Sequence, residues 1–192
     1  MAMIDTIRRS VADSLELKKS FFAANEEKIA SLAREICAVI EGGRKVLLYG
    51  NGGSAADAQH IAAEMVGRFR RERRPLPALA LTTDTSVLTC VGNDYGYDQV
   101  FARQVRALGR PGDLAIAIST SGNSPNVLEA TAAAIEMGLV TAAFTGSDGG
   151  KLGPMVRHHL NVPHKSTARI QEAHIMVGHI LCELVDEHLK GI

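Results

Sequence analysis

His60 and Glu64 form a pair of side chains that could act together in catalysis or metal binding. They stand four positions apart in a segment, residues 54–68, that we predict to be helical, so both side chains lie on one helix face. An imidazole beside a carboxylate can serve as an acid and base pair or as two ligands of a metal ion. Taken alone, the pair is also compatible with a packed histidine next to a solvated surface carboxylate.

A glycine-rich turn comes directly before this helix. Gly50-Asn51-Gly52-Gly53-Ser54 follows an apolar run at 45–49, which predicts a strand, a tight turn and then a helix. Glycines allow a ligand to approach the backbone closely. We expect Ser54 to cap the helix, whose first N–H groups then point at the turn, where an anion or a polyol could bind.

A second polar motif follows another buried strand, predicted at 114–118. It carries four hydroxyl side chains, those of Ser119, Thr120, Ser121 and Ser124. We expect Ser124 to be the N-cap of a helix that has Pro125 at its first position. Hydroxyls beside helix N-terminal amides form a phosphate cradle. Because the motif lacks the lysine of a nucleotide-binding P-loop, it indicates a small-molecule monophosphate and does not imply Mg²⁺.

Strands and helices that alternate along the chain would position both motifs. We predict strands at 45–49, 78–81, 114–118, 140–144 and 158–162. We predict helices at 54–68, 85–91, 98–108, 125–137, 151–156 and 166–189, with a break at Gly92-Asn93-Asp94-Tyr95-Gly96. This alternation indicates an α/β fold, a five-stranded parallel sheet with helices on both faces. The polar loops all follow strands, and ligands of such sheets bind beyond the carboxyl ends of the strands.

The first 41 residues have the apolar spacing of helices. Asn25-Glu26-Glu27 resembles a cap and an acidic first turn, which predicts two helices with a break near Ala24-Asn25. Residues 1–41 are too long and too amphipathic for a simple lead-in, so we expect an N-terminal helical extension that packs against another subunit. The whole chain, residues 1–192, is expected to form a single domain.

Composition narrows the classes of function. The formal net charge is zero and the basic run at 68–74 is interrupted, so no nucleic-acid partner is expected. Cys37, Cys90 and Cys182 lack paired spacing and are expected to be reduced, packed thiols, which suggests a cytoplasmic protein. No apolar stretch is long enough to cross a bilayer and residues 1–5 carry no signal-peptide pattern, so no membrane association is expected.

The motifs together resemble a known family. Residues 118–124, after an apolar strand, resemble the sugar-isomerase (SIS) domain family, whose members bind phosphosugars. Residues 50–60, 91–96 and 168–172 together resemble the phosphoheptose isomerase branch of that family, and the resemblance extends over essentially the whole chain. It implies a flavodoxin-like three-layer fold and the conversion of sedoheptulose 7-phosphate to D-glycero-D-manno-heptose 7-phosphate, the first step toward the heptose of lipopolysaccharide or surface glycans. It also implies a homotetramer with sites between subunits, and one zinc ion per subunit.

The resemblance also implies roles for individual residues. Glu64 would be the base and His179 its partner acid. The zinc ligands would be His60, Glu64, Gln171 and His179. The substrate would contact Asn51, Gly52, Gly53, Ser54, Glu64, Asn93, Asp94, Ser119, Thr120, Ser121, Ser124 and Gln171.

Spacing supports some of these roles and not others. Gln171 and His179 are eight residues apart, so on one straight helix they lie about 12 Å apart along the axis and do not easily reach the same ion. Ala168 stands where some family members carry Asp, so a polar role there is absent or supplied elsewhere. Arg68 is either a charge partner of the substrate or a salt-bridged surface residue.

The other histidines are given no catalytic role. We expect His174 to pack, His158, His159 and His188 to lie on the surface, and we make no prediction for His164.

Two other functions remain open at this stage. One is that of a non-catalytic relative that binds the bacterial replication initiator, and the other is that of a sugar-phosphate-sensing domain. The presence of both Glu64 and His179 favours an enzyme over the first, and the lack of an added DNA-binding segment argues against the second.

Overall fold

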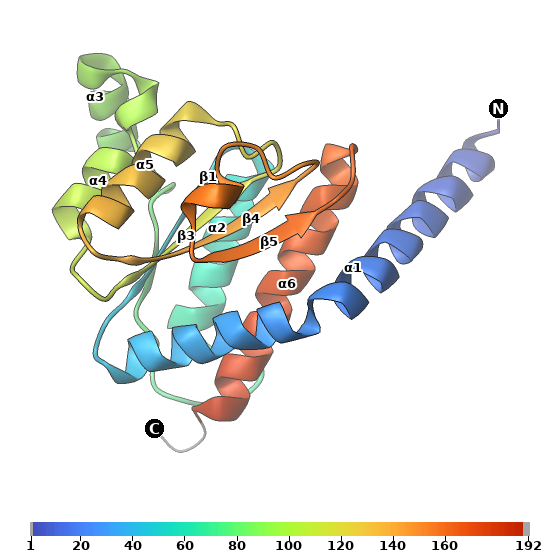
Figure 1. The fold of residues 1–192 in the computed structure, drawn as a ribbon, viewed down its shortest axis with the longest axis horizontal. Helices are drawn as coiled ribbons and strands as arrows, with labels where there is room; N and C mark the ends of the chain where they lie inside the picture. The colour runs from blue at the N-terminus through green and yellow to red at the C-terminus, as the bar shows by residue number, and fades with distance from the viewer. Residues whose placement is uncertain (1, 190–192) are drawn as a thin grey trace.

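The structure, a computed structural model, describes residues 2–189. A five-stranded parallel sheet lies at its centre (Figure 1). The strand order is β2-β1-β3-β4-β5. The strands are β1 (Val46–Gly50), β2 (Ala78–Ala80), β3 (Leu114–Ser119), β4 (Val140–Gly146) and β5 (His158–Val162). All five therefore match the sequence predictions to within two residues at each end. The single-domain prediction covered 1–192, of which residues 1 and 190–192 lie outside the described part.

Helices cover both faces of the sheet. They are α1 (Met3–Glu41), α2 (Gly53–Val66), α3 (Thr85–Tyr95), α4 (Ala102–Leu108), α5 (Pro125–Glu136) and α6 (Thr167–His188), with the 3₁₀ turns η1 (Tyr97–Gln99) and η2 (Gly153–Met155). Figure 1 shows α1, α2 and α6 on one side of the sheet and α3, α4 and α5 on the other. The predicted α/β three-layer architecture is confirmed. Within residues 2–189, no helix is both long and apolar enough to cross a membrane.

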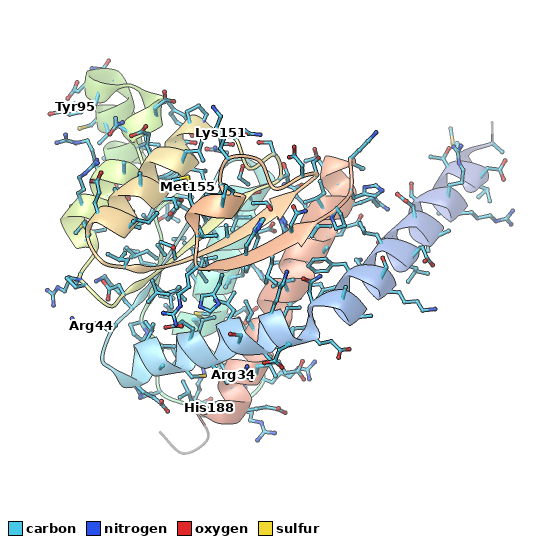
Figure 2. All side chains as sticks on the ribbon, viewed as in Figure 1. Arg34, Arg44, Tyr95, Lys151, Met155 and His188 are labelled. Atoms are coloured by element: carbon cyan, nitrogen blue, oxygen red, sulfur yellow. The ribbon has the colours of Figure 1, made fainter. Side chains whose placement is uncertain are left out.

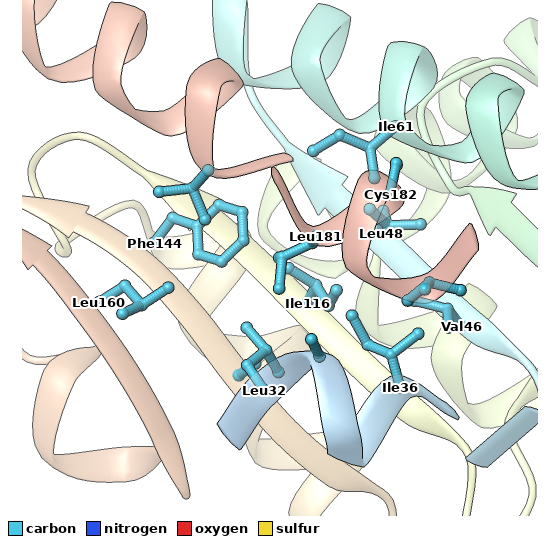
Figure 3. Packing of buried hydrophobic residues seen from close by; sticks show 14 of the residues in the cluster. Leu32, Ile36, Val46, Leu48, Ile61, Ile116, Phe144, Leu160, Leu181 and Cys182 are labelled. Carbon is cyan, nitrogen blue, oxygen red and sulfur yellow. The ribbon is translucent and has the colours of Figure 1, made fainter. Parts of the chain in front are cut away.

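The core forms because neighbouring strand residues point to opposite faces and nearly all are apolar. Leu48 packs with α1, α2 and α6 in one cluster, whereas Tyr49 packs with α4 and α5 in the other. Figure 3 shows Leu32 and Ile36 of α1 against Ile116 of β3. Each fully buried side chain of this kind contributes roughly 1.5–3 kcal/mol, so the central strands are firmly held and can position the loops that follow them.

The N-terminal prediction was wrong in one respect, since α1 is a single helix and not two. Asn25 does not cap a new helix, because its Nδ2 donates 2.8 Å to the carbonyl oxygen of Phe21 inside the same helix. Figure 1 shows α1 changing direction about midway. The second half packs into the core, while the first half exposes apolar side chains of Met3, Ile4, Ile7, Val11 and Leu15.

Three further details correct the sequence predictions. The break expected at 92–96 is confined to Gly96, whose φ is +86°, because α3 continues to Tyr95. The helix expected at 98–108 is divided into η1 and α4. The cysteines are all free thiols, as expected, but Cys90 is exposed on α3 while the other two are buried.

Candidate active site

The helices α2 and α6 place His179 beside His60, which in turn lies beside Glu64. His60 Nε2 lies 2.9 Å from His179 Nε2, so one ring donates a hydrogen bond to the other. Glu64 Oε1 lies 3.4 Å from His60 Nε2. The ring of Phe69 stacks on His179, with 5.7 Å between the ring centroids. An imidazole from α6 therefore lies against an imidazole of α2, and a carboxylate of α2 lies on that same imidazole.

The two helices can approach closely because α6 carries a glycine at the crossing. A Cβ on Gly178 would lie 2.6 Å from Ile61 Cδ1, so any larger residue would push the helices apart or move that side chain. Near the start of both helices, Gln171 lies directly against Gly53, again where a Cβ would collide with it. The helices therefore run side by side in the same direction, with Gln171 at the glycine turn and His179 about two turns further along.

This geometry brings some of the predicted metal ligands near one another. Within residues 2–189, no group of three or more His, Cys, Asp or Glu side chains is arranged so that it could hold a metal ion. Two imidazoles bound to one tetrahedral zinc ion at ordinary bond lengths have their nitrogens about 3.3 Å apart. The two Nε2 atoms, 2.9 Å apart, are closer than that and lie at hydrogen-bond distance. The donor types suit zinc, and a small separation of the rings would admit it.

The glycine turn is built differently from the prediction. The N-cap of α2 is Gly52, whose φ is +56°, and no side chain caps the helix. Ser54 lies inside the first helical turn and is buried, so its predicted capping role is wrong. Asn51 exchanges two hydrogen bonds of 2.8 Å with Asn126 of α5, each amide donating to the other's oxygen. Asn126 was not identified from the sequence, since nothing in a lone Asn after Ser-Pro indicates a partner 75 residues away.

The hydroxyl loop, residues 119–124, leaves the sheet at the same edge as the glycine turn, residues 50–54. The register of the parallel strands pairs Gly50 with Ile118, so both loops begin side by side. Ser124 is the N-cap of α5, as predicted, although its Oγ lies 3.2 Å from Ser119 Oγ and does not cap the helix. Thr120 is half-buried and Ser121 is exposed. The loop therefore presents hydroxyls together with the amino end of α5, which suits an anion.

A second loop fixes the conformation of the hydroxyl loop. Gly122 has a φ of +64° and sits against the carbonyl oxygen of Gly149, so a side chain there would collide with backbone. Its own carbonyl oxygen accepts 3.0 Å from the N–H of Leu152. The exit loop of β4, residues 146–150, thus packs against the backbone of the loop that is predicted to bind phosphate.

Asn93 and Asp94 lie apart from these residues. Both are exposed on α3, and Asn93 Nδ2 donates 2.8 Å to Asp94 Oδ1. Their helix packs on the sheet face opposite to α2 and α6. Ala168 is exposed in the first turn of α6. Arg68 lies on the surface, and its Nε is 3.9 Å from Glu72 Oε2. Of the two alternatives for Arg68, this contact agrees with a salt-bridged surface residue.

The remaining histidines differ in how deeply they are buried. His174 is buried, as predicted; its Nε2 donates 2.9 Å to the carbonyl oxygen of Thr145, its Nδ1 has no partner, and burial lowers its pKa to about 4. The surface prediction is wrong for His158, which is mostly buried beside Glu35, and for His159, which is half-buried and bonded to Thr145. His188 is exposed, as expected. His164, for which no prediction was made, lies 3.4 Å from Asp13.

One buried carboxyl group near the site was not anticipated. Asp57 lies one helical turn before His60, and its Oδ2 is buried without a hydrogen-bond partner. Burial raises its pKa to about 6, and the charge of His60 opposes that rise. The sequence carried no signal for this, because an Asp in the first half of an amphipathic helix is usually solvated.

Comparisons with known proteins agree with this arrangement. A family model described as SIS domain matches residues 11–146. A phosphoheptose isomerase of Aquifex aeolicus is 54% identical over 185 residues, which cover 96% of this chain and 97% of that protein. One of Roseiflexus sp. is 53% identical, covering 96% of each chain. Among solved structures, a phosphoheptose isomerase of Neisseria gonorrhoeae has a TM-score of 0.92 at 47% identity, covering 97% of this chain and 100% of that one. One of Francisella tularensis has a TM-score of 0.94 at 39% identity with the same coverage.

Proposed function

The chain belongs to the SIS domain family and, within it, to the phosphoheptose isomerases, and we propose that it converts sedoheptulose 7-phosphate to D-glycero-D-manno-heptose 7-phosphate. The observation that carries the proposal is identity above one half with named phosphoheptose isomerases along nearly the whole of both chains. An imidazole of α6 and a carboxylate of α2 that both contact His60 support it chemically.

The reaction moves a proton between neighbouring carbons through an enediol. Glu64 would remove a proton from C1 of the ketose and return one at C2, while His179 would exchange a proton with the sugar oxygens. Such acid and base groups each typically contribute about 10²–10⁴-fold. The contact of His60 with both groups supports their acting on one substrate.

The phosphate would bind to the hydroxyl loop, at Ser119, Thr120, Ser121 and Ser124. The sugar would lie between this loop and the turn at Asn51, Gly52, Gly53 and Ser54, with Gln171 above the turn. The amide of Asn51 is hydrogen-bonded to that of Asn126. We therefore propose that Asn51 holds the turn against α5 as well as facing the sugar.

The activity is tested by incubating the protein with sedoheptulose 7-phosphate in heavy water. The aldose product should carry solvent deuterium at C2, and Glu64→Gln should lose turnover while keeping the wild-type assembly and Tm. A variant that keeps the wild-type rate would show that Glu64 is not the base. A non-catalytic relative would give no aldose at all, so the same assay decides between the two functions.

Zinc, one ion per subunit, is proposed to bind at His60, Glu64 and His179, with Gln171 as the predicted fourth ligand. When bound, zinc would polarise an oxygen of the sugar as a Lewis acid. Metal analysis of protein purified without chelator tests occupancy. Added zinc should raise the Tm of the stripped wild-type protein and not that of His60→Ala. An equal rise in both would place the ion elsewhere.

A homotetramer with sites between subunits is proposed as the working assembly. The first half of α1 exposes apolar side chains, and Figure 2 shows Tyr95 at the outer edge of α3. Asn93 and Asp94 of α3 would then complete the site of a neighbouring subunit. Sedimentation velocity tests this: Ile7→Asp should dissociate the tetramer, and Arg9→Asp, on the opposite side of the helix, should not. A wild-type monomer would refute it.

The proposed setting is the cytoplasm, in the synthesis of heptose for lipopolysaccharide or surface glycans. No nucleic-acid partner is proposed, because basic residues of 68–74 pair with acids of the same protein. These pairs are Arg68 with Glu72, Arg70 with Glu183 and Arg73 with Asp186. Loss of heptose-containing glycan in a strain lacking the gene, restored by wild type and not by Glu64→Gln, would support this setting.

A further inference from the structure

The basic run at 68–74 has a structural task at the active site. After α2 ends, residues 67–74 fold back over α6. Phe69 stacks on the ring of His179. The backbone N–H groups of Arg70 and Arg71 donate to Asp186 Oδ2 of α6, at 3.0 and 3.4 Å. The segment therefore connects the helix that carries His60 and Glu64 to the helix that carries His179.

Arg73 is the centre of this connection. Its Nε donates 2.6 Å to Asp186 Oδ1, and its Nη2 donates 2.9 Å to the carbonyl oxygen of Glu64 itself. Its Nη1 lies within 3.2 Å of the carbonyl oxygens of Met65, Gly67 and Arg74 and shares its two hydrogens among them. Two of these carbonyls, those of Glu64 and Met65, belong to the last turn of α2, whose carbonyls lack helical partners. One guanidinium thus closes the end of α2 and bonds it to α6.

Only an arginine can make this set of bonds. The side chain of Arg73 is 6% exposed and that of Asp186 is 2% exposed, so water cannot replace either partner. Burial alone would raise the pKa of Asp186, but hydrogen bonds from Arg70 and Arg73 and the charge of Arg73 hold it below its ordinary value. A lysine offers a single point charge in place of a planar fork of donors. Asp186 is therefore ionised, and both of its carboxylate oxygens accept hydrogen bonds.

We call the bonds of Arg73 to Asp186 and to the Glu64 carbonyl oxygen the clamp. Its position matters because the catalytic residues lie between two places where α2 and α6 are held together. Gln171 and Gly53 meet at the start of the two helices, and Gly178 meets Ile61 beside His60 and His179. The bond between Arg73 and Asp186 is the last contact, about two turns beyond His179. Without it, the end of α2 that carries Glu64 would be held to α6 on this side only through contacts of residues 69–71.

We propose that Arg73 is a positioning residue for the isomerisation, which holds Glu64 of α2 at its working distance from His179 of α6 through Asp186. The inference rests on the proposed roles of Glu64 and His179. Misplacement of reacting groups by about 1 Å can cost roughly 100-fold in rate. Loss of the clamp should therefore lower kcat much more than it changes KM, since the hydroxyl loop that holds the phosphate is untouched.

The chain offers a matched control in Asp113. This buried carboxylate also accepts two backbone N–H groups, of Lys45 and Arg110, and the side chain of one cation, Lys45. It is held in the same way as Asp186, but at the amino ends of β1 and β3, where it touches neither α2 nor α6. Asp186→Asn and Asp113→Asn thus remove equivalent charges from equivalent surroundings.

The experiment compares Asp186→Asn, Arg73→Lys and Asp113→Asn for kcat, KM and Tm, at a temperature where each is folded. We expect roughly 10- to 100-fold lower kcat with KM within about twofold for the first two. Asp113→Asn should lower Tm comparably and keep kcat within about twofold. The ¹⁵N signals of the His60 and His179 rings should shift in Arg73→Lys and not in Asp113→Asn.

Equal loss of kcat in Asp113→Asn, or a wild-type kcat in both clamp variants, would overturn the inference. If Arg73→Lys does not fold, Asp186→Asn decides, because its amide still accepts a backbone N–H. Glu64→Gln, measured alongside, separates the two proposals. An active Glu64→Gln would refute the catalytic assignment, whereas an inactive one beside active clamp variants would refute the clamp alone.

Discussion

We expect His174 to make the stability of this protein sensitive to mild acid. Its ring is 1% exposed in the middle of α6, and its Nε2–H donates to the carbonyl oxygen of Thr145. The only site left for a second proton is Nδ1, which is buried without a partner. Protonation would therefore place a charge in an apolar setting, which is why burial lowers the pKa of His174 from 6.5 to about 4.

The direction and size of the effect follow from linkage. Between pH 6.5 and 4 the unfolded chain binds a proton at this histidine and the folded chain does not, so the free energy of unfolding falls as the pH falls through this window. Above pH 6.5 neither state is protonated and nothing is lost. At about 1.4 kcal/mol per pKa unit, the loss from pH 7.5 to 5 is about 2 kcal/mol. For a chain of this length that corresponds to a Tm lower by roughly 4–8 °C.

The assay is thermal unfolding of wild type and His174→Gln at pH 7.5 and 5, at one protein concentration. Glutamine can still donate to Thr145 but takes up no proton, so its Tm should fall less than that of wild type by the amount above. The raised pKa of Asp57 acts in the opposite direction in both proteins and cancels in the comparison. His188→Gln, which changes an exposed ring near the end of the same helix (Figure 2), should behave like wild type. Equal slopes in wild type and His174→Gln would refute the reasoning.

Two glycines at close contacts give further predictions. Gly178→Ala should lower kcat roughly 10-fold by pressing α2 away from α6, and adding Ile61→Ala should restore part of it; an unchanged kcat in the single variant would contradict the close packing. Gly122→Ala should raise KM for the phosphosugar about 10-fold or more, because a methyl group would collide with the backbone of Gly149 behind the hydroxyl loop. Gly43→Ala, also at positive φ but with open space around it, should cost only about 1 kcal/mol of stability and leave KM unchanged.

The sheet could be predicted because its signals are local. Each strand is an apolar run of the right length, and each run ends in a polar or glycine-rich loop, as with residues 114–118 before Ser119. Short strands need no information from elsewhere in the chain to be identified. The same holds for the pairing of His60 with Glu64, which follows from helical spacing alone.

Features that depend on distant contacts could not be predicted. The partner of Asn51 is 75 residues away, and that of Arg73 is 113 residues away. From the sequence, 68–74 is an interrupted basic run of the kind normally found on the surface. Only the fold shows that Arg73 of this run is bonded to a buried carboxylate, Asp186 of α6. The capping role of Ser54 failed for a related reason, since Gly52 reaches a backbone conformation that starts the helix one residue earlier.

The error in α1 shows how continuity of a helix and change of environment can be confused. The sequence pattern changes near Asn25 because the second half of α1 faces the core while the first half leaves it. A cap-like residue at that point suggested a break, yet the backbone needs none, since the Asn25 side chain bonds within the helix. Because α1 is one continuous helix, the packing of its second half on the core also fixes the direction of its exposed first half. The apolar residues from Met3 to Leu15 are therefore presented in a defined direction, which a flexible joint would not achieve, and this makes α1 suited to packing against a second subunit.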